Sequence, residues 1–444
     1  MPSANDVRGR KAETPDPVRA LQRKLYVAAK QNQRRRFHAL YDKVHRKDVL
    51  RRAWEEVARN GGAPGSDGVT IEAIKEAGSE GLLDELQLEL VEGRYRPRPA
   101  RRVTIPKRSG GERHLGVPCV RDRIVQAATK VVIEPIFEAD FASCSFGFRP
   151  RLSAQHACER VRRGLWGGSW WVVDADIKGF FDNLDHGLLL ALVRARISDR
   201  RVMGLIAGWL RSGVLVGTSV LNPKTGTPQG GVVSPLLANI YLHYLDAQWQ
   251  AFHQREGQLT RYCDDLVIVC RTESGAKSAK ASLQCLLQTL KLEMAEAKTR
   301  IVDLHHLEEG FVFLGFHFGK RTSRRNPSLS YPARWPSKAA VGVARDRIRE
   351  LTRTERVSEP LAFVVKDLNA FLRGWGAYFR HGNSGVQFAH LDRFVFERLS
   401  RLAARKRNAR SMRRGMAEVI DLTRSLGLYR LSGTVRHMDA HAST

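Results

Sequence analysis

Two acidic segments of the sequence have the residue types and spacing of a metal site. In WVVDADIKGFFDNLDH, an apolar run predicts a buried strand, and the period of two puts Asp174 and Asp176 on one face of it. In RYCDDLVIVC, Asp264 and Asp265 lie at a turn beside residues that favour strands. Adjacent carboxylates repel each other unless a cation lies between them. If the two strands pair, three carboxylates supply the oxygen ligands with which two Mg²⁺ ions could activate a hydroxyl and stabilise a pyrophosphate leaving group.

Each acidic segment alone also has a structural explanation. An Asp-Asp pair is common in solvated turns, and an acidic strand end is often a cap or a surface feature. Separation along the sequence does not show whether the two strands pair. The metal site is therefore a hypothesis that depends on the fold.

The segment between the acidic strands, GTPQGGVVSPLLANIYLHYLDAQW, predicts a loop followed by a helix. Ser234 and Pro235 suit the N-cap and the first helical position. Gly230 and Gly231 would let a nucleotide or base pair approach the backbone closely. The apolar face of the helix comprises Leu236, Leu237, Ile240, Tyr241, Tyr244 and Leu245.

Composition indicates a polyanionic partner. The 444 residues include 74 Lys and Arg against 46 Asp and Glu, a net charge of +28, which is typical of proteins that bind nucleic acid. No stretch approaches the twenty apolar residues of a spanning helix, and the N-terminus has no apolar signal core, so we expect an intracellular protein. The six cysteines include no C-x-x-C pair, which argues against a zinc knuckle and predicts reduced, mostly buried thiols.

Periodicity divides the chain into a helical start, a mixed middle and a helical end. Residues 18–60 show helical spacing with many basic positions, which a solvated helical face would also explain. Residues 101–120 predict a hairpin with Lys107 and Arg113 on its two arms. Strands and helices then alternate to about residue 319, and Arg-rich amphipathic helices follow residue 335, where we expect a domain boundary.

Taken together, the motifs resemble those of reverse transcriptases encoded by group II introns. DADIKGFFDNLDH, TPQGGVVSPLLANIYL and YCDD, in this order and spacing, are similar to the family's palm motifs. NGGAPGSDGVT resembles its N-terminal extension, and IPKRSGGERHLGVPCVRDRIVQ and SFGFRP resemble its finger motifs. KLEMAEAKTRIV and FVFLGFHF resemble a later palm motif and the primer grip, while LNAFLRGWGAYFR and LGLYRLSGTVRH resemble the maturase region called domain X and the family's C-terminal end. The resemblance covers about residues 18–437.

The resemblance implies an α+β right-hand polymerase. Fingers and palm would contain an antiparallel sheet, and an α-helical thumb or maturase domain X would follow. The expected parts are a disordered basic tail (1–17), an N-terminal helical extension (18–75), reverse transcriptase fingers and palm (76–330), thumb or domain X (331–425) and a short C-terminal tail (426–444).

The implied function is RNA-directed DNA synthesis by two-metal nucleotidyl transfer, combined with intron RNA binding and maturase activity in splicing. The implied cofactor is Mg²⁺, as two ions. The implied partners are group II intron RNA, an RNA template with a DNA primer, dNTPs and target DNA, without a membrane and with the oligomeric state left open. The implied location is the bacterial cytoplasm, with nucleoid association during action on DNA.

Carried over by position, the resemblance assigns residues to catalysis and to triphosphate contact. Asp176, Asp264 and Asp265 match the metal-binding aspartates, and Asp264 is the firmer of the adjacent pair. Lys107 and Arg113 match the finger residues that contact the incoming triphosphate, a role that suits their charge.

Three further residues match positions near the nucleotide. Phe181 matches the aromatic side chain that excludes a 2′-hydroxyl and so favours dNTPs; a core phenylalanine is the alternative. Gln229 matches a residue near the nucleotide and template. Lys298 could act as a general acid towards pyrophosphate; a surface lysine is the alternative.

In domain X, aromatic and basic residues interleave. Arg373, Trp375, Tyr378 and Arg380 suit phosphate contact and stacking on unpaired bases. The alternative for the aromatic residues is an ordinary helical core. The resemblance implies that this region grips intron RNA and also serves as the polymerase thumb.

The sequence departs from the family pattern at two places. Cys263 stands where many members have alanine, a change that leaves the chemistry alone. No cysteine follows Cys285, so we expect no HNH endonuclease domain. Two alternative hypotheses remain: a splicing factor with a vestigial polymerase, which the intact aspartates argue against, and a relative recruited to defence or repair.

Overall fold

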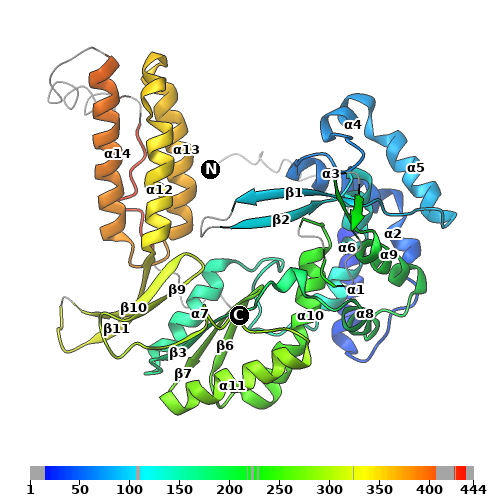
Figure 1. Ribbon diagram of the computed structural model, residues 1–444, viewed down its shortest axis with the longest axis horizontal. Coiled ribbons are helices and arrows are strands. Elements are labelled where there is room, and N and C mark those ends of the chain that lie inside the picture. Colours follow the sequence, from blue (N-terminus) through cyan, green and yellow to red (C-terminus); the bar gives the residue numbers. More distant parts are fainter. Residues whose placement is uncertain are drawn as a thin grey trace, which may run out of the picture. The chain divides into compact units, whose positions relative to one another are not determined.

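The computed structural model describes residues 16–106, 111–217, 219–221, 225–227, 230–323, 325–406, 425 and 427–436. Lys107, Gln229 and the N-terminal residues 1–15, for which we expect disorder, lie outside this part of the chain. The chain divides into two compact units, each assembled from separate segments (Figure 1). The first unit comprises Met1–Ser143, Lys178–Gln248 and Leu286–Glu293; the second comprises Cys144–Ile177, Trp249–Cys285 and Met294–Thr444.

The first unit is mainly helical and contains one four-stranded sheet. Its central helix, α6 (Val120–Glu138), is buried on most sides because apolar residues lie all around it, and it packs against α1 and α3. The sheet has the order β2-β1-β4-β5, and β1 and β2 form the predicted hairpin. The elements are α1 (Pro17–Gln31), α2 (Tyr41–Val44), α3 (Lys47–Asn60), α4 (Ile71–Ala77), α5 (Ser79–Val91), β1 (Ala100–Pro106), β2 (Glu112–Val117), a 3₁₀ turn (Phe180–Asp182), α8 (His186–Arg194), α9 (Arg200–Arg211), β4 (Val214–Val216), β5 (Ser219–Leu221) and α10 (Ser234–Gln248).

The helical pattern predicted over residues 18–60 is interrupted in the structure. Helix α1 ends at Gln31, and the Asn32 side chain accepts a hydrogen bond from the Arg34 backbone at 2.9 Å. Such a local bond stabilises a turn in place of a helix. The chain then pairs briefly at Phe37 with Ile197 before helix α2 begins.

The second unit contains an antiparallel sheet of order β6-β7-β3-β8. Its strands are β3 (Trp171–Asp176), β6 (Gln258–Tyr262), β7 (Asp265–Cys270) and β8 (Arg300–Asp303). Helix α7 (Ala154–Trp166) packs on β6 and β7. Helix α11 (Glu273–Thr289) follows β7 and continues into the first unit, and a π-helical turn (Trp249–His253) precedes β6.

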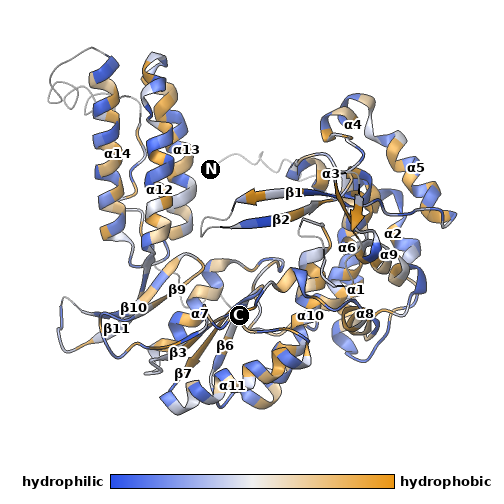
Figure 2. Cartoon of the chain, in the orientation of Figure 1, coloured by the Kyte–Doolittle hydropathy of each residue, from blue (hydrophilic) through white to orange (hydrophobic). Residues whose placement is uncertain are grey.

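The rest of the second unit is a three-stranded sheet followed by three long helices. The sheet is β11-β10-β9, with β9 (Gly310–Phe313), β10 (Phe316–Thr322) and β11 (Ser330–Pro336). The helices α12 (Lys338–Leu351), α13 (Leu361–Phe379) and α14 (Gly385–Lys406) lie side by side, with a 3₁₀ segment (Thr354–Ser358) between the first two. Apolar and polar residues alternate along these helices (Figure 2), which confirms the predicted amphipathic pattern.

Charged residues in this unit are partly buried. The carboxylate of Glu159 on α7 accepts hydrogen bonds from Arg162 at 2.7 Å and pairs with Arg334 of β11 at 3.2 Å. Because Arg334 is only 2% exposed, this pairing offsets the cost of burying its charge.

The cysteines agree with the prediction of reduced, mostly buried thiols. All six cysteines are free thiols, and five of them are buried, with Cys285 exposed. Within the described residues, no helix combines the length and the apolar character needed to cross a lipid bilayer.

Candidate active site

The aspartates of the two acidic segments meet in the sheet of the second unit. Strand β3 pairs antiparallel with β7, and the register puts Asp176 directly opposite Asp265. Tyr262 pairs with Asp265 across the β6–β7 hairpin, so Cys263 and Asp264 form a two-residue loop. The predicted pairing of the two strands is therefore confirmed, and Asp176, Asp264 and Asp265 lie at one end of the sheet.

Low solvation and electrostatic repulsion at this sheet end both disfavour the charged form of Asp265. The residue is exposed, but nearby protein reduces the solvation of its carboxylate, and the carboxylates of Asp264, Asp176 and Asp174 repel its charge. Together these raise the pKa of Asp265 to about 7. Burial also raises the pKa of Asp174, although Arg300 donates a hydrogen bond to it at 3.3 Å. The site thus carries more negative charge than the protein compensates.

Lys298 supplies part of the missing positive charge. Its ammonium group donates a hydrogen bond to Asp176, and this contact raises the pKa of Lys298. Lys298 lies between α11 and β8. The lysine is therefore protonated and in contact with one of the three aspartates.

The residues fit a divalent cation by their chemistry. Crowded carboxylate oxygens are the ligands that Mg²⁺ prefers, and a cation would relieve the repulsion that raises the pKa of Asp265. Among the residues that the structure describes, no group of three or more His, Cys, Asp or Glu side chains is already arranged as a metal site.

Sequence reasoning missed Arg261, which lies under the loop of Cys263 and Asp264. Its side chain is 0% exposed, and its guanidinium donates to the Cys263 carbonyl at 3.0 Å and to the Ser145 hydroxyl at 2.7 Å. The only signal in the sequence is a charged residue within an apolar strand, immediately before the YCDD motif. A surface position would explain that signal equally well until burial is known.

Two of the residues expected to contact the nucleotide lie in the first unit. Arg113 is on β2, exposed and opposite Ile105. Phe181 is partly exposed and rests edge-on against Phe180, with ring centroids 5.2 Å apart. Phe180 is only 2% exposed, so the pair divides into one core ring and one ring that reaches the surface.

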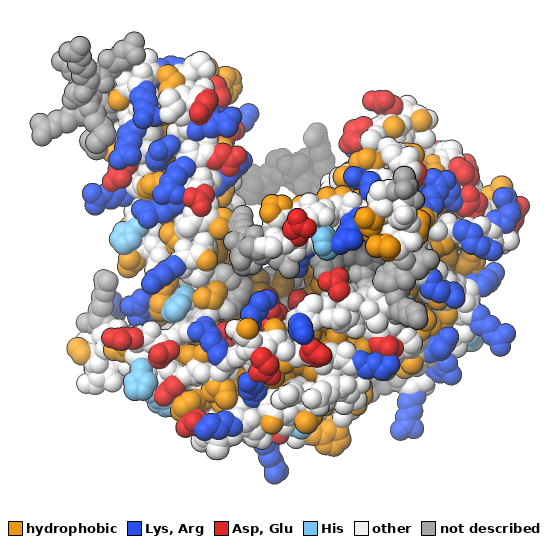
Figure 3. All heavy atoms as spheres, in the orientation of Figure 1, with side chains coloured by type: hydrophobic (Ala, Val, Ile, Leu, Met, Phe, Trp, Pro, Cys, Tyr) orange, Lys and Arg blue, Asp and Glu red, His pale blue; other side chains and the backbone are white. Residues whose placement is uncertain are grey.

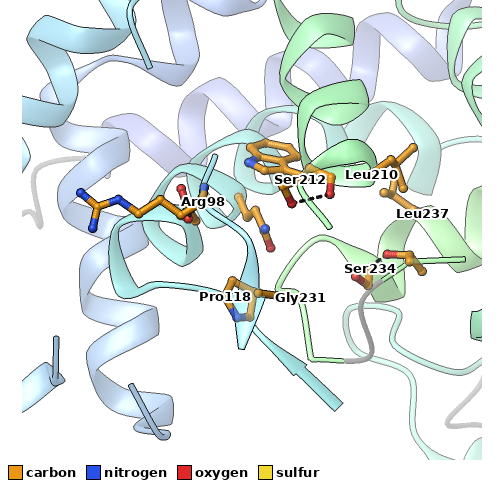
Figure 4. Close-up of a pocket in the computed structure, with 12 residues that line it drawn as sticks. Arg98, Pro118, Leu210, Ser212, Gly231, Ser234 and Leu237 are labelled. Carbon is orange, nitrogen blue, oxygen red and sulfur yellow. Dashed lines mark hydrogen bonds between the residues drawn. The ribbon is translucent and has the colours of Figure 1, made fainter. Parts of the chain in front are cut away.

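The loop that contains Gln229 is held at both ends within the first unit. Val232 donates its backbone hydrogen to Gln126 of α6 at 2.9 Å, and the hydroxyls of Thr227 and Ser234 are 2.7 Å apart. A cavity of about 20 Å³ lies between this loop and helices α6, α9 and α10, and Figure 4 shows Pro118 and Gly231 side by side at its wall. The space would hold about one water molecule.

A glycine is needed at position 230 because the backbone of β2 packs closely against it. Its φ is +126°, and a Cβ atom there would come within 2.8 Å of the Gly116 carbonyl on β2. The sequence predicted that Gly230 and Gly231 admit a nucleotide. The close approach at Gly230 is made by the hairpin backbone, a tertiary contact that no local pattern indicates.

Comparison with known proteins identifies the family. Residues 105–318 match the family model of the reverse transcriptase (RNA-dependent DNA polymerase), and residues 342–418 match the group II intron maturase-specific domain. The chain is 35% identical over 349 residues to protein YkfC of Escherichia coli, covering 69% of this chain and 90% of YkfC. It is 36% identical over 231 residues to the group II intron-encoded protein LtrA of Lactococcus lactis, covering 52% of this chain and 38% of LtrA. The chain belongs to the group II intron reverse transcriptase family.

Membership confirms the fold class and the enzyme class. The α+β domain is a reverse transcriptase domain, that is, an RNA-directed DNA polymerase, and the helical region from residue 342 belongs to the maturase-specific domain. Such domains bind RNA, and enzymes of this family use divalent metal ions. A solved Cas6-RT-Cas1–Cas2 complex is 21% identical with a TM-score of 0.36 over 57% of this chain and 43% of that chain, a likeness too low to support any statement about this reverse transcriptase.

In the maturase-specific helices of the reverse transcriptase, the aromatic residues singled out from the sequence pack inside the fold. Trp375 lies 4.6 Å from Phe379, between ring centroids, and the Tyr378 hydroxyl donates to the Leu314 carbonyl at 2.9 Å. Arg373 is exposed, with its guanidinium 5.6 Å from the Tyr429 ring. Packing accounts for Trp375 and Tyr378, so an RNA contact by these two residues stays a prediction, as it does for Arg373 and Arg380.

The raised pKa of Asp265 predicts a pH-dependent response to Mg²⁺. Between the unfolded value near 3.8 and about 7, the folded protein retains a proton that the unfolded chain has lost, so the metal-free protein loses stability as pH rises through this window. Mg²⁺ must displace that proton below pH 7 but not above it. We expect Mg²⁺ to raise the melting temperature more at about pH 8 than at about pH 6, measured by thermal denaturation.

Asp265→Asn is the control for this prediction. An amide has no proton to lose in this range, so the difference between the two pH values should disappear. An equal Mg²⁺ effect at both pH values in the unaltered protein would contradict the assignment of Asp265 to the metal site.

Proposed function

We propose that Asp176, Asp264 and Asp265 hold two Mg²⁺ ions that catalyse transfer of deoxynucleotides to a DNA primer on an RNA template. The β3–β7 register carries this proposal, because it brings together carboxylates far apart in the sequence. Bound there, the ions would lower the pKa of the primer 3′-hydroxyl and balance the charge of the pyrophosphate leaving group. The aspartates hold the ions, and Asp265 must be deprotonated to do so.

Other residues would bind and orient the nucleotide. Lys298 keeps its proton because Asp176 raises its pKa, so it has a proton to give to pyrophosphate. Arg113 and Lys107 of the finger hairpin would contact the triphosphate, and Gln229 would lie near the nucleotide and template. Phe181 would limit the sugar to 2′-deoxyribose.

The test is primer extension on an RNA template with dNTPs, in Mg²⁺ and in Ca²⁺. We expect extension in Mg²⁺ and none in Ca²⁺, whose larger and more flexible coordination shell suits these ligands without supporting the reaction. No extension in Mg²⁺ by a folded protein that binds RNA would favour a splicing factor with a vestigial polymerase.

The helical region would bind group II intron RNA and assist its splicing. Lys and Arg side chains gather over α12 and α14 on the face shown in Figure 3, and the net charge of +28 favours a polyanion. Within this scheme, fingers and palm extend to about residue 330, and thumb or domain X begins near residue 331. Action on target DNA would place the protein at the nucleoid.

Neutralising Arg373 and Arg380 tests the RNA contact. Each phosphate contact that is lost lowers the slope of log affinity against log salt by about one. We therefore expect the double change to Gln to lower that slope by about one to two, measured by filter binding of intron RNA over a range of salt concentrations.

The matched control neutralises Arg347 and Arg393, which are also on these helices. They already pair with Glu350 at 2.6 Å and with Glu397 at 3.0 Å, so their loss should alter the slope less. Equal slopes in the two double variants would place the RNA elsewhere.

A further inference from the structure

The loop that presents the catalytic aspartates has an unfavourable backbone conformation. Cys263, its first residue, has a φ of +59°, in the left-handed region that residues other than glycine rarely adopt. Two-residue hairpin loops usually place Gly, Asn or Asp at positive φ. A cysteine persists in this conformation only if surrounding contacts hold it there.

Arg261 makes the contact that holds Cys263. Its Nη1 donates to the Cys263 carbonyl oxygen, so the guanidinium is bound to the backbone of the loop itself. Its Nη2 donates to the hydroxyl of Ser145, which like Arg261 is 0% exposed. One rigid, planar group thus joins the loop to a second segment of the chain.

That second segment packs directly against the loop. Arg261 donates its backbone hydrogen to the Cys144 carbonyl at 2.8 Å, and its own carbonyl accepts from Phe146 at 2.9 Å. A Cβ atom on Gly147 would lie 2.5 Å from the Cys263 nitrogen. Residues 144–147, which are Cys144 and the first three residues of the SFGFRP motif, therefore leave the loop no room to relax on this side.

We propose that Arg261 is a positioning residue of the active site. Its guanidinium is held by the Ser145 hydroxyl, and Gly147 packs against the Cys263 backbone. Together these contacts fix Cys263 in the left-handed conformation and thereby set the direction in which Asp264 and Asp265 project. The proposal rests on the proposed catalytic role of these aspartates and adds a residue that touches neither substrate nor metal. Without the guanidinium, the loop relaxes and the two carboxylates lose their fixed separation from Asp176.

The thiol of Cys263 gives a readout that does not require catalysis. This side chain is only 6% exposed, so it reacts with a maleimide only when the loop opens. Loss of two buried hydrogen bonds from a charged donor in Arg261→Met should raise the rate of Cys263 labelling about 10- to 100-fold. Mass spectrometry after limited labelling identifies which cysteine has reacted. The exposed Cys285 should react equally fast in both proteins, and the buried Cys158 and Cys270 should stay protected.

Arg334→Met is the matched control. Arg334 is another buried arginine of the same unit, 2% exposed, but it pairs with Glu159 of α7 and not with the Cys263 carbonyl. Both variants should lose thermal stability, and only Arg261→Met should expose Cys263. Labelling of Cys263 that rises equally in both variants, or in neither, would overturn the proposal.

Kinetics provide a second, independent readout. In Arg261→Met we expect the Mg²⁺ concentration for half-maximal primer extension to rise about tenfold, while KM for dNTPs stays unchanged. Arg261→Lys keeps the positive charge but not the planar, two-ended guanidinium. Its Mg²⁺ concentration for half-maximal extension should therefore lie between those of the natural protein and Arg261→Met. Ser145→Ala removes only the hydrogen bond between Arg261 and the Ser145 hydroxyl. It should change Cys263 labelling and Mg²⁺ dependence in the same direction as Arg261→Met, but by less. This variant keeps the test decisive if Arg261→Met does not fold.

The outcomes separate this proposal from the proposed function. If the natural protein extends primers but Arg261→Met leaves Mg²⁺ dependence and Cys263 labelling unchanged, only the positioning role is contradicted. A natural protein that never extends primers would contradict the polymerase, while the labelling result would still show whether Arg261 holds the loop.

Discussion

Replacing Asp264 by asparagine should lower the rate of primer extension at least about 10³-fold, which corresponds to about 4 kcal/mol of transition-state stabilisation. The amide keeps the size of the side chain but removes a negative charge from a site that would hold two divalent cations. RNA binding should stay close to that of the natural protein, because Asp264 makes no contribution to a basic surface. Single-turnover extension and filter binding measure the two properties separately.

The same substitution has a second expected effect, of opposite sign. Asp264 is one of the carboxylates that raise the pKa of Asp265, so its neutralisation removes repulsion from the metal-free site. We expect a higher melting temperature without Mg²⁺ at neutral pH and a smaller increase when Mg²⁺ is added. Loss of activity together with a gain in stability distinguishes a functional carboxylate from a structural one.

Asp303→Asn is the control for Asp264→Asn. Asp303 lies in the same sheet, on β8, but pairs with Trp171 at the opposite end of β3 from Asp176. It should leave primer extension nearly unchanged. Equal loss of extension and RNA binding in Asp264→Asn would contradict the separation of the two roles.

Replacing Phe181 by alanine should reduce the preference for dNTPs over NTPs about 10- to 100-fold, the range over which packing alone discriminates a single hydroxyl. Phe181 is the ring of the Phe180–Phe181 pair that reaches the surface, and Phe180 supports it edge-on at 5.2 Å. Removing the outer ring leaves space where a 2′-hydroxyl would otherwise clash. The measurement is the ratio of kcat/KM for a dNTP and the matching NTP.

Phe180→Leu provides the comparison. Its ring is 2% exposed, so this change should cost about 1–3 kcal/mol of folding free energy and leave the sugar ratio nearly unaltered. Unchanged sugar selectivity in Phe181→Ala would make Phe181 an ordinary packing residue.

The two acidic strands, β3 and β7, could be predicted from sequence because their patterns are local. The period of two around Asp174 and Asp176, and the apolar run after Asp265, specify two strands with acidic ends. Their pairing depended on the family resemblance, since no local rule sets the register of strands so far apart. The structure supplies that register, with Asp176 opposite Asp265.

The residues that sequence reasoning missed act through tertiary contacts. Arg261 looks like a surface arginine until its burial beneath Cys263 is known. Gly230 looks like a ligand-binding glycine until the Gly116 carbonyl is found beside it. Trp375 fits RNA stacking and core packing equally well in sequence, because helical spacing does not say what lies against a helix face.

The interleaving of the two units has a consequence for how the chain folds during synthesis. Strand β3 leaves the ribosome early, but its partner β7 follows only after the whole segment Lys178–Gln248, which belongs to the other unit. Until then, β3 has an unpaired edge, and non-local pairings of this kind form slowly. The first unit is thus synthesised up to Gln248 before β7, and only its segment Leu286–Glu293 follows β7. Asp176 can meet Asp264 and Asp265 only after most of the first unit has been made.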